Sequence, residues 1–250
     1  MSWHDTIVSL GLLLVATLYS AVGHGGASGY LAVLSLANVD QPHMASTALL
    51  LNVLVASLSL TAYTRAGHLK LRHALPFVAL SVPCAFLGGL TPVSAKVYAG
   101  LLALVLGYSA WRLMFFSQQL TGEGETKMPP LKVALPAGAV LGFISGMLGV
   151  GGGIFLSPVM LFMRWANAKQ TSAIAALFIV LNSIAGICGR LIGGTFTVSS
   201  TWPMVAAALI GGAVGANFGA NKLSRPAICK TLAAVLMLAV IKLISEAFAG

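Results

Sequence analysis

Two glycine-rich clusters have the residue types and spacing that could perform chemistry. Residues 23–27 read Gly-His-Gly-Gly-Ala, and residues 149–153, which begin 126 positions later, read Gly-Val-Gly-Gly-Gly. A helix that begins after such a turn presents unpaired N–H groups and roughly half a unit of positive charge, and the missing side chains let a ligand approach the backbone. Close helix packing is the alternative use of such glycines. We predict that both clusters bind an anion, through Gly25, Gly26, Ser28, Gly151, Gly152 and Gly153.

Polar side chains in apolar stretches provide a second group of candidates. His24 lies inside the first cluster, where it could bind the anion, carry a coupled proton or make a structural hydrogen bond. Asn52 aligns with Asn182 at an offset of 130, and their amides could donate to anion oxygens or bond between helices. Hydrogen bonding between helices is the favoured role for the hydroxyl groups inside the apolar stretches, which are those of Thr47, Ser57, Thr171, Ser172 and Ser183. Arg190, at the end of an apolar stretch, is interpreted as an interfacial side chain whose guanidinium reaches water.

Acidic and metal-binding groups are sparse. The five acidic residues all fall near the ends of apolar stretches or in a polar linker. Cation-coupled carriers and proton pumps usually place a carboxylate inside the helix bundle, so the pattern favours an anion or a neutral solute. The three cysteines, Cys84, Cys188 and Cys229, have no metal-type spacing and are interpreted as small core residues. We expect no metal, no cofactor and no enzymatic activity, because no ligand cluster, carboxylate pair or nucleotide loop is present.

The elements that position these residues must lie in a membrane. Hydrophobic residues make up 58% of the 250 positions and charged residues only 8%, against about 25% in soluble proteins. Uncharged stretches repeatedly reach the roughly 17–25 residues that a spanning helix needs. The 14 lysines and arginines lie in short runs between these stretches, which argues against nucleic-acid binding and in favour of charges that set topology. The chain is therefore predicted to be an all-α integral membrane protein surrounded by the lipid bilayer.

The two halves of the sequence are predicted to be repeats. Residues 1–116 form the first, residues 117–131 a cytoplasmic linker and residues 132–250 the second. Each opens with an apolar stretch, residues 6–39 and 133–163, that would be about 51 and about 46 Å long as one helix, against about 30 Å of hydrocarbon. We predict that each stretch bends back at its glycines. Each repeat would then hold a glycine-broken helical hairpin and three spanning helices.

Loop charge favours inverted repeats over parallel ones. If each hairpin returns to the side of the membrane from which it came, 11 lysines and arginines lie on one side and three on the other. If each long stretch instead crosses the membrane once, the repeats are parallel and these residues divide 8 to 6. The positive-inside rule therefore prefers two inverted repeats, with the basic side in the cytoplasm and both termini outside.

The second cluster and its surroundings resemble a known family. The run Ser-Gly-Met-Leu-Gly-Val-Gly-Gly-Gly-Ile-Phe-Leu-Ser-Pro at residues 145–158, followed by Gln-Thr-Ser-Ala at 170–173 and Leu-Asn-Ser at 181–183, is similar to the TauE/SafE membrane permeases. The resemblance covers nearly the whole chain. The chain departs from the family pattern in its first half, where His24 interrupts the glycines and Ala27 replaces the last glycine.

The resemblance implies a permease of the bacterial cytoplasmic (inner) membrane for a small sulfur-containing anion, such as sulfite or an organosulfonate. We expect substrate binding between the two glycine segments and alternating access of the halves. A carrier of a neutral or cationic solute is the alternative, and a membrane-embedded enzyme is a weaker one. The exact anion, the direction of transport and the coupling ion are left open, as is the oligomeric state, for which a homo-oligomer is one option.

Overall fold

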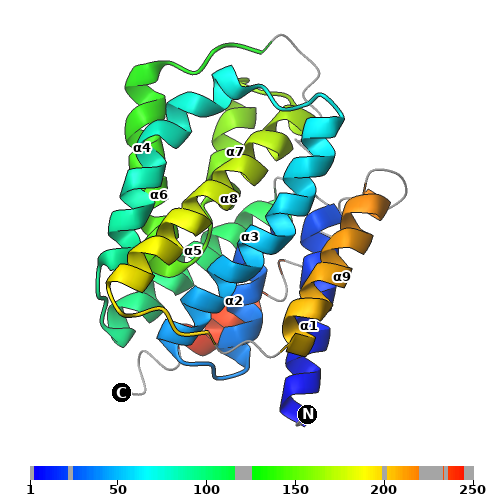
Figure 1. Cartoon of the computed structure of the whole chain (residues 1–250), viewed down its shortest axis with the longest axis vertical. Helices are drawn as coiled ribbons and strands as arrows, with labels where there is room; N and C mark the ends of the chain where they lie inside the picture. The colour runs from blue at the N-terminus through cyan, green and yellow to red at the C-terminus, as the bar shows by residue number, and fades with distance from the viewer. Residues whose placement is uncertain are drawn as a thin grey trace.

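The protein is built from helices throughout the described residues. The computed structural model describes residues 3–21, 25–115, 126–198, 202–219, 233 and 236–244, and these contain no strand. The helices are α1 (Trp3–Ala21), α2 (Ala27–Leu36), α3 (Gln41–Arg65), α4 (Leu71–Leu90), α5 (Ala95–Phe115), α6 (Leu131–Leu148), α7 (Gly153–Phe162), α8 (Ala168–Ile192) and α9 (Trp202–Gly219). A further helical segment covers residues 236–244, and Figure 1 gives the arrangement.

Several of these helices are suited to a membrane. Within the described residues, α3, α4, α6 and most of α8 are long and apolar enough to cross one. Apolar side chains are also exposed over the outer surface, for example Leu104 at 71% and Ile192 at 72%. In water such a surface would be unfavourable, whereas in a bilayer it faces hydrocarbon.

The first long apolar stretch is a broken helix, as predicted. A β-carbon on Gly29 of α2 would lie 2.3 Å from Val15 Cγ1 of α1, and one on Gly11 of α1 would lie 3.1 Å from Val33 Cγ1 of α2. Later residues of α2 therefore lie beside earlier residues of α1, so α2 runs back along α1.

The second stretch also bends back. Gly149 ends α6 with φ of 80°, in the left-handed region that favours glycine, and α7 begins at Gly153. After α7, the Arg164 carbonyl accepts a hydrogen bond from the Lys127 amide at 2.9 Å. The chain thus returns to the end of the molecule where α6 began.

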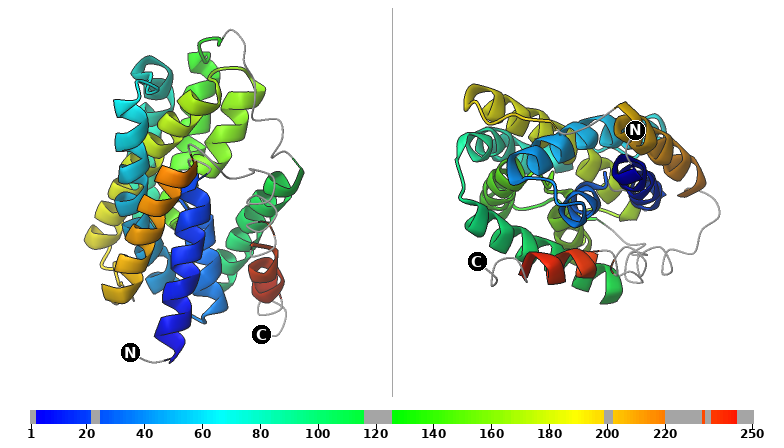
Figure 2. Two further views of the ribbon diagram at one scale, coloured as in Figure 1. Left: turned by 90° about the vertical axis from the view of Figure 1, so that its right-hand side faces the viewer. Right: turned by 90° about the horizontal axis from the view of Figure 1, so that it is seen from below.

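Two helix pairs pack in parallel through glycines spaced four residues apart. On α6, β-carbons at Gly138, Gly142 and Gly146 would lie 2.2, 2.2 and 1.9 Å from the carbonyl oxygens of successive turns of α4, those of Phe77, Ser81 and Ala85. On α9, β-carbons at Gly211 and Gly215 would lie 2.3 and 2.1 Å from the carbonyl oxygens of Leu13 and Thr17 in α1. Only glycine permits such close backbone contact. Figures 1 and 2 both show α1 and α9 side by side.

The two longest helices, α3 and α8, cross in opposite directions. A β-carbon on Gly186 of α8 would lie 3.3 Å from Leu49 Cδ1 of α3, while Ile179 of α8 packs with Ala56 of α3. The contact moves forward along α3 as it moves backward along α8, so the helices are antiparallel (Figure 1). Together they form the centre of the molecule.

The helix ends repeat along the chain at a nearly constant offset. Both short helices, α2 and α7, have ten residues and are followed by a left-handed residue, Asn38 or Arg164, which stand 126 positions apart. Both α3 and α8 have 25 residues and are followed by a left-handed glycine, Gly67 or Gly194, 127 positions apart.

This offset differs from one alignment made from the sequence. When α3 and α8 are aligned by their ends, which stand 127 positions apart, Asn52 is paired with Ile179 and Asn182 with Val55. The sequence match of Asn52 with Asn182 at an offset of 130 differs from this register by three residues. Three residues are close to one helical turn, so both amides still face the crossing of α3 and α8.

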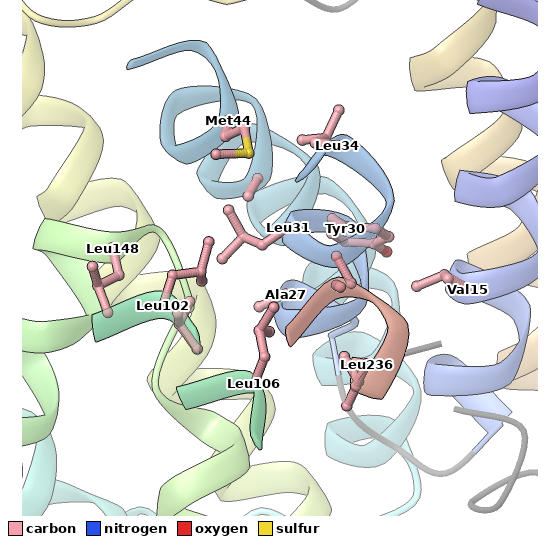
Figure 3. Packing of buried hydrophobic residues seen from close by; sticks show 14 of the residues in the cluster. Val15, Ala27, Tyr30, Leu31, Leu34, Met44, Leu102, Leu106, Leu148 and Leu236 are labelled. Atoms are coloured by element: carbon pink, nitrogen blue, oxygen red, sulfur yellow. The ribbon is translucent and has the colours of Figure 1, made fainter. Parts of the chain in front are cut away.

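The buried core lies mainly around α2. Its side chains pack against those of α1, α3 and α5, the end of α6 and the segment 236–244. Figure 3 shows part of this cluster, with Tyr30 and Leu31 of α2 between Leu102 of α5 on one side and Val15 of α1 on the other. A second cluster joins α4, α6, α7 and α8 around Phe77 and Phe178.

Candidate functional site

The two glycine loops begin the short helices with backbone that suits glycine. Gly26 precedes α2 with φ of 91°, and Gly151 and Gly152 precede α7 with φ of 75° and 74°. Neither Gly26 nor Gly152 supplies a side-chain cap, so the first-turn N–H groups of α2 and α7 receive no acceptor from the capping residue. Both short helices therefore have the positively polarised N-terminus that the sequence predicted.

The loops converge on one side chain at the crossing of α3 and α8. β-Carbons on Gly25, Gly151 and Gly153 would lie 3.3, 3.0 and 2.5 Å from atoms of Ile179. Gly25 also faces Ala56, and Gly151 faces the amide nitrogen of Asn52, both at 3.0 Å from the added carbon. Two loops far apart in sequence thus meet at the centre of the molecule.

The central crossing carries buried amides with unsatisfied atoms. Asn52 and Asn182 both have no exposed surface. Asn52 lies between Leu49 and Ala56 of α3, and Asn182 lies between Ile179 and Gly186 of α8, which are the residues of the two contacts described above. Among the described residues, Asn182 Oδ1 and Nδ2, Asn52 Oδ1 and the hydroxyl of Ser183 have no hydrogen-bond partner. A buried polar atom without a partner is costly, and a bound ligand is one way to satisfy it.

The end of α6, just before the second loop, is fully capped. Its last carbonyl groups lose their helical partners and are satisfied by side chains from three other helices. Arg190 donates to the Met147 carbonyl at 2.6 Å and to that of Gly146 at 3.4 Å, while Tyr98 donates to Leu148 at 3.0 Å. The Asn52 amide donates to Gly149 at 3.4 Å. A broken helix inside a membrane needs such donors.

Arg190 is therefore not the interfacial side chain that the sequence suggested. It is only 7% exposed and lies against the negative end of α6. The prediction was wrong because a span end in sequence lies beside the buried end of a broken helix in space. The core assignment of Cys188 is also wrong, since its side chain is exposed on α8, and Cys229 lies outside the described residues.

The remaining predicted residues have defined environments, with one exception. Ser28 is buried and its hydroxyl lies 2.7 Å from that of Tyr19. Gln170 belongs to a capping box with Asn167 at the start of α8. The Ser57 hydroxyl donates to the Val53 carbonyl of its own helix, and not to another helix as we expected for the hydroxyl groups. These two are structural. His24 lies outside the described residues.

Sequence reasoning missed a buried arginine beside the second loop. Arg112 of α5 is 6% exposed and donates to the Ile154 carbonyl at 2.8 Å. In an α-helix that carbonyl would accept from residue 158, but Pro158 has no N–H. The proline was the available signal, because it frees one carbonyl of α7 that some donor must satisfy.

The assembled site is rich in donors, and two buried arginines, Arg112 and Arg190, bond to backbone carbonyls on either side of its second loop. Backbone groups of the two loops and the amide of Asn52 lie around Ile179, and the unsatisfied amide of Asn182 stands about one turn further along α8. The described acidic residues, Asp5 and Asp40, belong to the first turn of α1 and the residue before α3. Such a site can hold a small polar ligand, and its helix dipoles favour negative charge.

A family model and two relatives all indicate a membrane transporter. The family model described as sulfite exporter TauE/SafE matches residues 8–243. The probable membrane transporter protein y4hK of Sinorhizobium fredii is 35% identical over 240 residues, 95% of this chain and 97% of that protein. The probable membrane transporter protein YunE of Bacillus subtilis is 29% identical over 129 residues, 52% of this chain and 47% of that protein. No solved structure matches the chain.

Proposed function

Because the chain belongs to the sulfite exporter TauE/SafE family and is a multi-pass membrane transporter, we propose that it is a secondary permease for a small anion. Its substrate class is sulfite or an organosulfonate. The observation that carries this proposal is the meeting of both glycine loops at the crossing of α3 and α8, beside buried amides with unsatisfied atoms.

The chemistry of the site supports an anion over a cation. Helix N-termini and amide N–H groups are donors, and the dipoles of α2 and α7 place positive potential at the loops. A sulfite or sulfonate group has three acceptor oxygens that can take several of these donors at once. We place the anion between Gly25, Gly26 and Ser28 on one side and Gly151, Gly152 and Gly153 on the other, with Asn52 and Asn182 as amide ligands.

Alternating access would come from two inverted repeats. We assign residues 1–116 and 132–250 to the repeats and 117–131 to a cytoplasmic linker. Support comes from the equivalent helices α3 and α8, which run in opposite directions, as expected if a two-fold axis lies in the membrane plane. The parallel pairs α1 with α9 and α4 with α6 exchange under the same operation.

Charge supports an orientation in the cytoplasmic (inner) membrane. The Lys127 amide bonds to Arg164, and His73 Nδ1 lies 2.8 Å from the Trp165 carbonyl, so these loops share one end of the molecule. That end carries Arg65, Lys70, Arg72, Lys127, Lys132, Arg164 and Lys169. By the positive-inside rule it faces the cytoplasm.

Transport in proteoliposomes tests the proposal. The purified chain is reconstituted, and counterflow is measured with sulfite, with taurine as a sulfonate, with thiosulfate and with a neutral sugar alcohol. We expect saturable exchange of at least one sulfur oxyanion and none of the neutral solute. Counterflow of the neutral solute without any response to the oxyanions would contradict the proposal and favour a neutral-solute carrier.

A further inference from the structure

Tyr30 of α2 has a buried hydroxyl that none of the interactions above uses. We propose that this hydroxyl is a substrate ligand, donating a hydrogen bond to an oxygen of the bound anion at the first glycine loop. The inference rests on the proposed function and adds to it a residue that the glycine pattern did not reveal.

The environment of the Tyr30 hydroxyl is unusual for a structural tyrosine. The residue has no exposed surface, yet its hydroxyl has no hydrogen-bond partner among the described residues. The other two buried tyrosines of this region are paired, Tyr98 with the Leu148 carbonyl and Tyr19 with Ser28. Buried tyrosine hydroxyls usually have a partner, because water no longer satisfies them. Figure 3 shows Tyr30 between the other core residues of α2 and Val15 of α1.

The position of the hydroxyl connects it to the loop. A β-carbon on Gly26 would lie 2.7 Å from both Tyr30 Cζ and the hydroxyl oxygen. Tyr30 stands one turn into α2, where its backbone amide bonds to the Gly26 carbonyl at 2.9 Å, and helical side chains lean toward the N-terminus. The phenol therefore ends at the start of α2, where first-turn N–H groups have no side-chain cap.

The phenol fits an anion better than other ligands at this point. A neutral tyrosine donates one O–H, and a hydrogen bond to an ionised oxygen is stronger than one to a neutral acceptor. The unsatisfied donor and the positive end of α2 are complementary to the same negative group. At the second loop, a β-carbon on Gly152 would instead meet the ring of Phe178 at 2.6 Å, and that ring carries no hydroxyl group. Tyr30 therefore adds its donor at the first loop.

Conservative removal of single hydroxyls tests this assignment. Tyr30→Phe deletes an unpaired hydroxyl, and the matched control Tyr98→Phe deletes one that caps the Leu148 carbonyl. For each purified protein we would measure the thermal unfolding midpoint in detergent with and without sulfite, and the half-saturation concentration for sulfite and taurine in proteoliposomes.

The two variants should give opposite results. Tyr30→Phe should unfold at the wild-type temperature or above without anion, should gain less stability from sulfite, and should raise the half-saturation concentration about tenfold to a hundredfold, as expected for a lost bond to a charged group. Tyr98→Phe should unfold at a lower temperature and keep the wild-type half-saturation concentration.

Two results would overturn the assignment. If Tyr30→Phe keeps the wild-type half-saturation concentration, the hydroxyl does not contact the substrate. If it loses stability as Tyr98→Phe does, the hydroxyl has a structural partner. Both differ from failure of the proposed function, in which the wild-type protein itself would move no sulfur oxyanion.

Discussion

Asn182 has an amide in the middle of α8 whose oxygen and nitrogen are both buried without a partner among the described residues. In a protein interior each such atom costs about 1–3 kcal/mol when left unsatisfied. A side chain kept for stability alone would be apolar at this position. Under the proposed function this amide is a substrate ligand, and its replacement should separate stability from transport.

We predict that Asn182→Leu keeps or raises the stability of the protein while abolishing most transport. Leucine has a similar shape and needs no hydrogen bonds, so removing the unsatisfied atoms should stabilise by up to about 1–3 kcal/mol. Unfolding in detergent and counterflow of sulfite measure the two effects. Normal counterflow in a stable Asn182→Leu protein would remove this amide from the site.

Arg112 and Pro158 should behave as a coupled pair. Arg112→Met leaves the Ile154 carbonyl buried without its donor, which should cost about 1–3 kcal/mol. Adding Pro158→Ala supplies an N–H that can bond to this carbonyl within α7, so the double variant should recover part of the loss. Thermal unfolding of the four proteins in the cycle measures the coupling. A double variant no more stable than Arg112→Met would show that the arginine acts elsewhere.

At the scale of helices, the glycines divide into two kinds. Gly26, Gly151 and Gly152 have left-handed backbone and shape the loops, while Gly138, Gly142 and Gly146 line a helix contact. Leucine at Gly26 or Gly152 would combine an unfavourable φ with contact at 2.7 or 2.6 Å from its β-carbon to an aromatic side chain. Such variants should fail to accumulate, and they would not isolate a binding role.

The contact of α4 with α6 should be sensitive to a single methyl group. In Gly142→Ala the β-carbon would lie 2.2 Å from the Ser81 carbonyl oxygen, so the two helices must separate. We expect a loss of about 1–3 kcal/mol, typical of overpacking. The control Gly100→Ala adds a carbon with no atom within 4 Å and should be neutral or stabilising. Equal unfolding midpoints for the two variants would contradict the close contact.

The sequence predicted where the helices break better than it predicted which side chains they bring into contact. The lengths of the apolar stretches and the glycine positions were enough to predict the break between α6 and α7, because a single helix would exceed the bilayer. The contacts of Ile179, Tyr30 and Arg190 could not be predicted. When most faces of a helix are apolar, periodicity does not distinguish the lipid-facing side from the core, and these contacts join segments distant in sequence.

At the scale of the whole molecule, the distribution of charge follows the path of the chain. Because α2 runs back along α1, helix α3 begins at the end of the molecule where α1 began. Helix α8 likewise begins at the end where α6 began, because α7 runs back to it. The loops around residues 66–70, 126–130 and 163–167 then gather at one end. The opposite end carries Lys96 and Lys242, the latter bonded to Asn38 at 2.6 Å. An asymmetry of this kind fixes the orientation of a protein in its membrane.

Accessibility of single cysteines should report this orientation. Arg72, Arg164 and Lys96 are all exposed, the first two at the basic end and the third at the other end, so cysteines placed there should react without disturbing the core. We expect Arg72→Cys and Arg164→Cys, in a background lacking Cys84, Cys188 and Cys229, to react with an impermeant maleimide only in inside-out vesicles. Lys96→Cys should react in intact cells. Single crossings by the two glycine-broken stretches would put positions 72 and 164 on opposite sides. Reaction of those two sites from opposite faces would therefore contradict the returning hairpins and, with them, the inverted repeats.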